Sequence, residues 1–285
     1  MDGDSPGLPL RGRPVARRLL DFNARTLELA QVARTRREMS FLASVLTDGD
    51  YWQYAWNQGR TSYLANFGSD LYLAVGLMAL VLPDHPNSKQ WLQYTLGELE
   101  KEFTYYISPD GVGEENIANY YLWTWRQLTV LLGALQHNGI FDAAKHPRYQ
   151  AACRFWIDVL TPPQAKLAAY AAAEPVKPEE RLRRIPPFGD HGFSDNVCLE
   201  HGGQTGILRD ADPQLAGESA WAWREACGAK PATHLGAIPH VLLADPTVAP
   251  RVPALASRRL RGFGAVLRNH FPSDKESFPG RPSRE

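Results

Sequence analysis

Apolar residues recur at helical spacing through most of the first 160 residues of the chain. A period of about 3.6 residues is typical of amphipathic helices, and short clusters of Gly, Pro, Asp and Asn separate the periodic segments. The pattern predicts helices at about 21–46, 69–82, 88–107, 115–139 and 147–160. Because the turns between them are short, neighbouring helices are expected to pack antiparallel, as hairpins.

The pattern changes after Leu160. Proline pairs interrupt the chain, residues 189–206 have the character of a loop, and the one helix that is clearly predicted runs from about Gln214 to Cys227. Weak alternation over 262–267 predicts a strand, which either pairs upstream or begins a further domain, because a lone strand is unstable. The expected fold class is mainly α: an α/α toroid, or incomplete α/α barrel, of antiparallel helical hairpins with a short β segment at the C-terminus.

The composition is that of a globular protein. With 285 residues, 44% of them hydrophobic, and a formal net charge of zero, the chain can bury a sizeable core. The balanced charge gives no argument for nucleic acid or a membrane surface as a partner, and the apolar stretch 71–82 is too short to span a bilayer. The N-terminus lacks the apolar core of a signal peptide. The three cysteines show no metal-ligand spacing, so we expect buried, inert thiols, no metal and no cofactor.

Residues 110–127 carry the most informative combination of side chains, and they read DGVGEENIANYYLWTWRQ. At helical spacing, one stripe holds Asn116, Tyr120, Trp123 and Gln127. Amides and hydroxyls can bind sugar oxygens, and flat aromatic rings can pack against the apolar side of a pyranose. The stripe therefore indicates a carbohydrate site, with a plain helix–helix contact as the alternative. A second stripe is expected to face the core: Tyr121, Trp125, Leu128, Leu132 and Leu135.

Carboxylates near this segment raise the alternative of a glycoside hydrolase, which needs two of them facing across the scissile bond. Glu114 and Glu115 are adjacent and would point about 100° apart on a helix, so they cannot form that pair. Folding would have to bring in a partner such as Asp190, which stands beside His191 in the Pro- and Gly-flanked segment 186–192. The alternative role for Asp190 is an Asx turn.

Other catalytic motifs find less support. No GxSxG motif indicates Ser–His–Asp catalysis, and the glycine-rich run 202–206 lacks the lysine of a phosphate-binding loop. Asp210 and Asp212 could bind a cation, but two carboxylates just before Pro213 are more typical of a cap for the next helix.

Several short motifs occur in an order known from one enzyme family. They are, along the chain, LVLPDHPNSKQW (80–91), Asp110-Gly111-Val112, Glu115-Asn116, Tyr120, the loop 186–190, the cluster 209–213 and RGFGAVLR (261–268). In these features, and over most of its length, the chain resembles the heparinase II/III-like polysaccharide lyases.

The resemblance implies an α/α toroid followed by an antiparallel β domain, with β-elimination on uronic-acid polysaccharides in the cleft between them. Removing the proton at C5 requires that the uronate carboxylate be neutralised, a role that the resemblance gives to Asn116. Glu115 and Tyr120 would support Asn116, and Tyr170 is the hypothesis for the tyrosine that takes the proton, with plain packing as its alternative role. The further substrate contacts that we expect are Tyr121, Trp123, Gln127, Asp190 and His191.

Two departures from the family pattern leave the function open. Tyr121 stands where many relatives have a histidine, and the chain stops at Glu285, near the expected start of the β domain. We therefore expect an N-terminal extension (1–20), a toroid domain (21–255) and the start of a β-sandwich with an irregular tail (256–285). The expected function is that of a lyase that cleaves uronic-acid-containing polysaccharides by β-elimination. If the chain is a truncated form, its activity is expected to be reduced. The alternatives are a toroid glycoside hydrolase and a non-catalytic carbohydrate-binding fragment, and neither oligomeric state nor compartment can be predicted.

Overall fold

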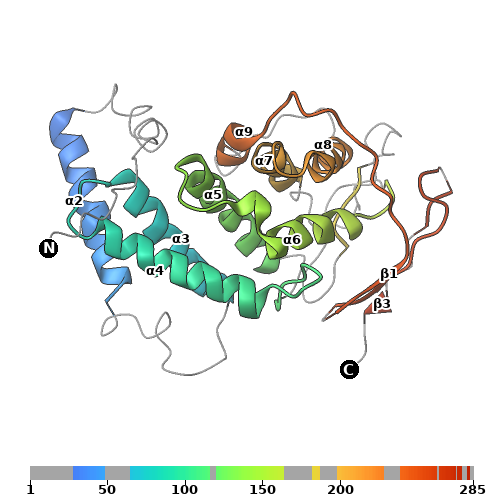
Figure 1. Ribbon diagram of the computed structural model, residues 1–285, viewed down its shortest axis with the longest axis horizontal. Coiled ribbons are helices and arrows are strands. Elements are labelled where there is room, and N and C mark those ends of the chain that lie inside the picture. The colour runs from blue at the N-terminus through green and yellow to red at the C-terminus, as the bar shows by residue number, and fades with distance from the viewer. Residues whose placement is uncertain are drawn as a thin grey trace, which may run out of the picture.

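The computed structural model describes residues 28–48, 65–115, 120–163, 182–186, 198–227, 238–261, 263–273, 275–277 and 281–282. This part of the chain is mainly helical and carries a small antiparallel sheet near the C-terminus (Figure 1). The α-helices are α2 (Leu29–Leu46), α3 (Ala65–Val81), α4 (Ser88–Lys101), α5 (Leu122–His137), α6 (Pro147–Asp158), α7 (Cys198–Leu208), α8 (Pro213–Cys227) and α9 (Ile238–Leu243). The other elements are the π-helix η1 (Glu102–Tyr106), the 3-10 helix η3 (Ala143–Lys145) and the strands β1 (Arg258–Leu260), β2 (Gly264–Val266) and β3 (Arg281–Pro282).

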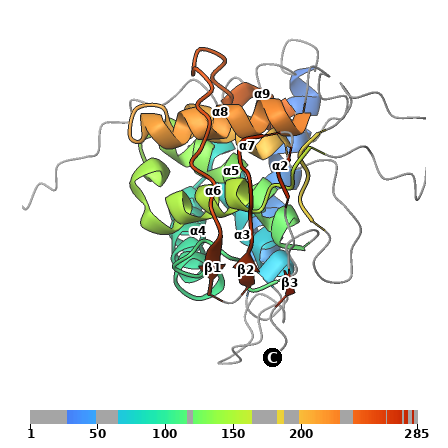
Figure 2. The ribbon, with the colours of Figure 1, turned by 90° about the vertical axis from the view of Figure 1, so that its right-hand side faces the viewer.

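Among the described helices, two successive pairs pack as hairpins, α3 with α4 and α7 with α8. The short turn 82–87 joins α3 to α4, the turn 209–212 joins α7 to α8, and the helices of each pair contact one another. Helix α5 connects the two groups because it contacts α3 on one side and α7 and α9 on the other. Figure 2 views the body from the sheet end, with α8 lying above α6 and the three strands in front.

Most of the predicted helices are confirmed. The segments expected at 69–82, 88–107 and 147–160 are α3, α4 with η1, and α6, while α2 accounts for the described part of 21–46. The predicted start of the fourth helix is wrong, because Glu114 and Glu115 lie in a bend; Tyr120 and Tyr121 are π-helical and lead into α5 at Leu122. The reason is that the backbone of Glu114 is bonded to the preceding segment, where its N–H donates to the Tyr106 carbonyl at 2.9 Å.

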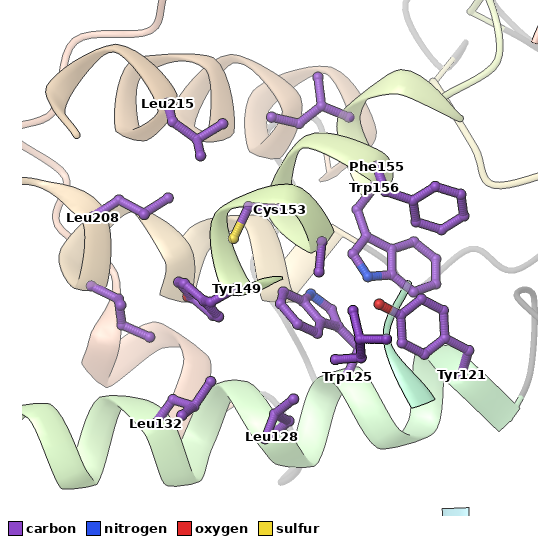
Figure 3. Packing of buried hydrophobic residues seen from close by; sticks show 14 of the residues in the cluster. Tyr121, Trp125, Leu128, Leu132, Tyr149, Cys153, Phe155, Trp156, Leu208 and Leu215 are labelled. Carbon is purple, nitrogen blue, oxygen red and sulfur yellow. The ribbon is translucent and has the colours of Figure 1, made fainter. Parts of the chain in front are cut away.

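The main core lies between α5 and α6 (Figure 3). The predicted core stripe of α5 is confirmed, since all five of its members are at most 2% exposed. Its rings stack on those of α6: Tyr121 on Trp156 with centroids 5.0 Å apart, and Trp125 on Tyr149 at 5.4 Å. Aromatic residues bury large areas, so this layer fixes how α5 lies against α6.

The expectation of a loop over 189–206 is tested only in part, because residues 189–197 lie outside the described part of the chain. It is wrong for residues 198–206, which belong to helix α7. Glycine has a low helix propensity, which is why this stretch has the character of a loop in the sequence. Here the glycines allow close packing instead: a Cβ on Gly202 would come within 2.9 Å of the Trp223 ring, and one on Gly206 within 2.0 Å of the Leu243 carbonyl oxygen. Tertiary contacts with α8 and α9 therefore outweigh the local preference.

The turn before α8 confirms the prediction of a helix cap. The Asp212 carboxylate accepts the backbone N–H of Leu215 at 2.9 Å, and Pro213 is the first helical residue. Such a side chain satisfies one of the free N–H groups of the first turn. Asp210 instead forms an exposed ion pair with Arg209 at 2.8 Å.

The predicted C-terminal strand is confirmed as β2, and it has partners on both sides. β1 pairs with it antiparallel with Arg258 opposite Val266, and β3 pairs with it antiparallel with Arg281 opposite Ala265. The strand thus pairs upstream, which was one of the two open expectations. β3 also shows that the segment expected to be an irregular tail contributes to the sheet.

A buried cluster of charged residues fastens this C-terminal segment to the helices. The Glu276 side chain is 1% exposed and accepts hydrogen bonds from two guanidinium groups, those of Arg183 at 2.8 Å and of Arg268. The Arg268 guanidinium also donates to the carbonyl oxygens of Asp158 at 3.1 Å and Leu160 at 2.6 Å, which cap the end of α6. Each charge thus has an opposite charge or a carbonyl dipole beside it, which buried ions require.

The cysteines differ from the expectation of three inert thiols. Cys153 is a free thiol in the core, where burial raises its pKa well above the usual range. Cys227, at the end of α8, is disulfide-bonded, so the expectation is wrong for this residue. Widely spaced cysteines say nothing of pairing until the fold brings them together.

Candidate functional site

The exposed stripe of α5 meets α3 at Asp70. The Trp123 Nε1–H lies 3.0 and 3.2 Å from the two carboxylate oxygens of Asp70, and the Gln127 amide lies 3.5 Å from one of them. Two residues predicted for the site are thus brought together by a third, which the sequence analysis missed. Partial burial raises the pKa of the Asp70 carboxyl group, and the hydrogen bonds from Trp123 and Gln127 oppose this shift.

Two aromatic side chains stand exposed on this stripe. Trp123 is 45% exposed and Tyr120, at the entrance of α5, is 41% exposed. The bond to Asp70 holds the indole by its N–H edge, so the ring has a fixed orientation while much of its surface faces solvent. A fixed, exposed aromatic face beside a carboxylate and an amide is suited to the apolar and polar sides of a sugar ring.

The loop that precedes α5 is held in one conformation by its own hydrogen bonds. The Ser108 carbonyl accepts the Gly111 N–H at 2.9 Å, the Ser108 N–H donates to the Val112 carbonyl at 2.8 Å, and Ile107 pairs with Gly113. Gly111 has a φ of +81° and packs against α6, where a Cβ would lie 2.1 Å from the Ala151 carbonyl oxygen. This position requires glycine on both counts.

Tyr121 supports this loop from the core. Its hydroxyl group donates to the Gly111 carbonyl at 2.7 Å, and its ring would meet a Cβ on Gly113 at 2.3 Å. Tyr121 was predicted both for the core stripe and as a substrate contact, and the structure places it 2% exposed in the core. It therefore positions the loop in this arrangement rather than facing solvent.

The C-terminal sheet reaches the same loop. The backbone N–H of Arg261, just after β1, donates to the Asp110 carboxylate at 2.9 Å, and the Arg261 side chain lies 3.9 Å from the same oxygen. The loop is therefore held between α6, Tyr121 and the sheet. Asp110, which the sequence indicates as a turn residue, also makes the contact between the helical body and the C-terminal segment.

A buried carboxyl group lies behind the loop. Glu102, the first residue of η1, is 2% exposed and accepts a hydrogen bond from the Ser69 hydroxyl group at 3.0 Å. Burial raises its pKa to about 8, with the charges of Glu115 and Glu98 acting in the same direction and hydrogen bonds from Ser69 and Tyr72 opposing them. The group is consequently protonated at neutral pH. π-Helical turns inside α-helices are frequent at functional sites.

Of the remaining predicted residues, the structure describes Glu115 alone. Glu115 is half-buried at the end of the loop and close enough to Glu102 for their charges to interact. The others lie outside the described residues: Asn116, Tyr170, Asp190 and His191. The structure therefore brings Trp123 and Gln127 together and puts Tyr120 and Glu115 at the approach to α5, and it leaves the predicted catalytic groups untested.

Asp70 and Glu102 are the residues that sequence reasoning missed. A signal for them exists, because Ser69 and Asp70 are polar residues that directly precede the apolar second half of α3. The sequence gives no sign that Ser69 faces Glu102 while Asp70 faces Trp123, which depends on how α3 packs between η1 and α5.

One further ion pair lies next to the stripe. Arg126 and Glu200 are joined by a contact of 2.5 Å between Nε and Oε1, and the Glu200 side chain is 1% exposed. The pair links α5 to α7. Because the Arg126 charge has a carboxylate beside it, the surface around Gln127 carries no excess positive charge from this residue.

A serine–histidine pair occurs elsewhere and is not arranged for nucleophilic catalysis. Ser40 Oγ and His85 Nε2 are 2.7 Å apart, beside a surface hollow of about 400 Å³ that Arg36 and Phe41 also line. His85 Nδ1 accepts a hydrogen bond from the backbone N–H of Asn87 at 3.2 Å, so in the neutral ring Nε2 carries the hydrogen and donates a hydrogen bond to Ser40 Oγ. A general base would need a free lone pair at that nitrogen.

Two other kinds of site are not seen among the described residues. No group of three or more His, Cys, Asp or Glu side chains is gathered there as metal ligands. In the same part of the chain, no helix combines the length and apolarity that crossing a bilayer demands.

The geometry thus gives an exposed aromatic and polar stripe on α5, a loop fixed from three sides and a buried protonated acid behind it. Comparison with models of known protein families finds no match for the chain, and neither does comparison with curated proteins.

Proposed function

We propose that the chain is a polysaccharide lyase that cleaves uronic-acid-containing polysaccharides by β-elimination, and that its hairpins form part of an α/α toroid. The observation that carries this proposal is the junction of Trp123, Asp70 and Gln127 beside the loop that leads to Glu115. An aromatic face, a carboxylate and an amide at one exposed place are the groups that bind a sugar ring.

The elimination itself is assigned by resemblance. Asn116 would neutralise the uronate carboxylate so that charge can develop after the C5 proton leaves, and Tyr170 would take that proton. Glu115 and Tyr120 would orient Asn116. The fixed conformation of the loop 108–113 supports this proposal, because a group that must meet one substrate atom needs a rigid base.

A non-catalytic sugar-binding role is the second candidate. The described side chains on the stripe bind and orient but include no pair of groups placed to act as acid and base on one bond. Under this proposal, the chain would keep affinity for acidic polysaccharides without turnover.

Ultraviolet absorbance separates the lyase from the non-catalytic role. Elimination produces an unsaturated uronate, which absorbs in the ultraviolet, so turnover would raise the absorbance. The chain is mixed with heparan sulfate, heparin and alginate, and binding is measured in parallel by calorimetry. Asn116→Ala should abolish the rise in absorbance and keep binding. Trp123→Ala should weaken binding roughly fivefold, as expected for an aromatic contact of about 1 kcal/mol.

The matched control is Phe41→Ala. Phe41 is 69% exposed on α2, away from the stripe, so its loss should change neither binding nor turnover. Binding without any rise in absorbance would favour the non-catalytic role. Failure of the chain to bind any of the three polymers would refute both proposals.

A further inference from the structure

Glu102 is an acid that the proposed reaction does not use and that the fold nevertheless buries. It follows α4 directly and opens η1, the π-helical turn that ends at Tyr106. Its side chain points to α3, where the Ser69 hydroxyl group donates to it at 3.0 Å. An ionised carboxylate at this depth would lose most of its hydration, so a buried acid needs either a cation or a proton.

Among the described charged groups around Glu102, no cation neutralises its carboxyl group. Glu98 on α4 and Glu115 on the loop add negative charge, while the hydroxyl groups of Ser69 and Tyr72 on α3 donate hydrogen bonds. The side chains of Tyr121, just before α5, and of Tyr106, at the end of η1, interact with Glu102 as well, and the ammonium group of Lys101 is paired with Glu98 at 2.6 Å. The proton is therefore what balances Glu102, and its pKa of about 8 places the loss of that proton just above neutral pH.

The backbone connects Glu102 to the loop. The Glu102 carbonyl accepts the Ile107 N–H at 3.0 Å, which closes the π-turn, and the Tyr106 carbonyl accepts the Glu114 N–H at 2.9 Å. The loop 108–113 thus starts and ends on η1. Any displacement of η1 from α3 changes the position of both ends of the loop.

We infer that Glu102 is a positioning residue for the acidic ligand of the proposed function: its uncharged carboxyl group holds η1 on α3, and the loop built on η1 holds Glu115 at the approach to α5. The inference rests on the proposed function for the identity of the ligand. When Glu102 loses its proton, a third carboxylate charge joins those of Glu98 and Glu115. That charge repels a uronate polymer and weakens the attachment of η1.

The first arm of the test needs no ligand. Hydrogen exchange of the segment 107–115 is compared in the wild type and in Glu102→Gln, at pH 5 and at pH 9. The amide side chain of Gln stays neutral, so the two proteins should exchange nearly alike at pH 5, and the wild type should exchange faster at pH 9. Comparing both proteins at the same pH removes the intrinsic effect of hydroxide.

Two further measurements keep the result interpretable. Exchange within 152–157, in the core of α6, shows whether Glu102→Gln folds as the wild type does. Ser69→Ala retains the acid and removes its hydroxyl partner, so it should loosen 107–115 already at pH 7. Equal exchange of this segment in the wild type and Glu102→Gln at pH 9, or an unchanged segment in Ser69→Ala, would overturn the positioning role.

The second arm uses heparan sulfate and alginate as probes. If the protonated form alone binds, the apparent Kd or KM of the wild type rises about tenfold at pH 9, since about a tenth of the molecules then hold the proton. The constant should stay within about twofold in Glu102→Gln, and kcat should change little in either protein. Absence of binding in both proteins at pH 7 would refute the proposed function, whereas a parallel rise in both would refute only the role of Glu102.

Discussion

The buried carboxyl group of Glu102 predicts a specific dependence of stability on pH. Its pKa is about 8 in the folded chain, against an ordinary value of 4.5 that we take for the unfolded chain. Between these two values the folded state holds a proton that the unfolded state has lost, so stability falls as pH rises. The slope is about 1.4 kcal/mol per pH unit, which over the whole interval amounts to about 5 kcal/mol.

Glu102→Gln removes this slope because the amide does not titrate. The variant should match the wild type in its pH dependence below pH 4.5, gain about 3 kcal/mol on it by pH 7 and about 5 kcal/mol above pH 8. Urea unfolding followed by tryptophan fluorescence, at half-unit steps from pH 4 to 9, measures the difference directly. Other titrating groups cancel because both proteins share them.

The control for this experiment is an exposed carboxylate. Glu38 forms an exposed i,i+4 ion pair with Arg34 at 2.7 Å on α2, and Glu38→Gln should change stability only slightly. The reasoning is refuted if the stability curves of the wild type and Glu102→Gln run parallel between pH 4.5 and 8. Such a result would mean that the folded chain does not hold the proton.

Two other substitutions test the packing that surrounds the site. Glu276→Gln leaves the buried guanidinium groups of Arg183 and Arg268 without their shared carboxylate. This should lower the free energy of unfolding by about 3–5 kcal/mol. A loss below about 1 kcal/mol would contradict the structure. Gly206→Ala would put a Cβ 2.0 Å from a backbone carbonyl of α9 and should destabilise the chain by roughly 1–3 kcal/mol. Gly97→Ala, with open space around the new methyl group, should instead stabilise the chain by up to about 1 kcal/mol. The same urea unfolding assay measures all three variants.

Helical periodicity predicted the elements whose apolar residues face a single neighbour. The stripe containing Trp125 and Leu128 is core in the structure as expected, because α5 buries one face against α6. α7 escaped prediction because its glycines are unfavourable for an isolated helix and become favourable only where α8 and α9 lie close enough to use the space. Sequence spacing carries no information about such neighbours.

The candidate site was predictable along one helix and not across helices. Trp123 and Gln127 are four residues apart, so their shared face follows from helix geometry. Asp70 lies more than fifty residues earlier and joins them only because α3 packs beside α5. Glu102 looks like a surface residue of an ordinary helix in the sequence, and its burial depends on the turn by which η1 departs from α4.

The contact between Asp110 and Arg261 makes the sheet and the loop parts of one thermodynamic system. If a ligand that orders the loop also favours this contact, then ordering the sheet must favour the ligand by the same factor, since coupling free energies are reciprocal. A chain segment that adds a strand beside β1 or β3 would then act as an effector of the proposed binding site without touching it. The affinity of that proposed site would then report whether such a strand is bound.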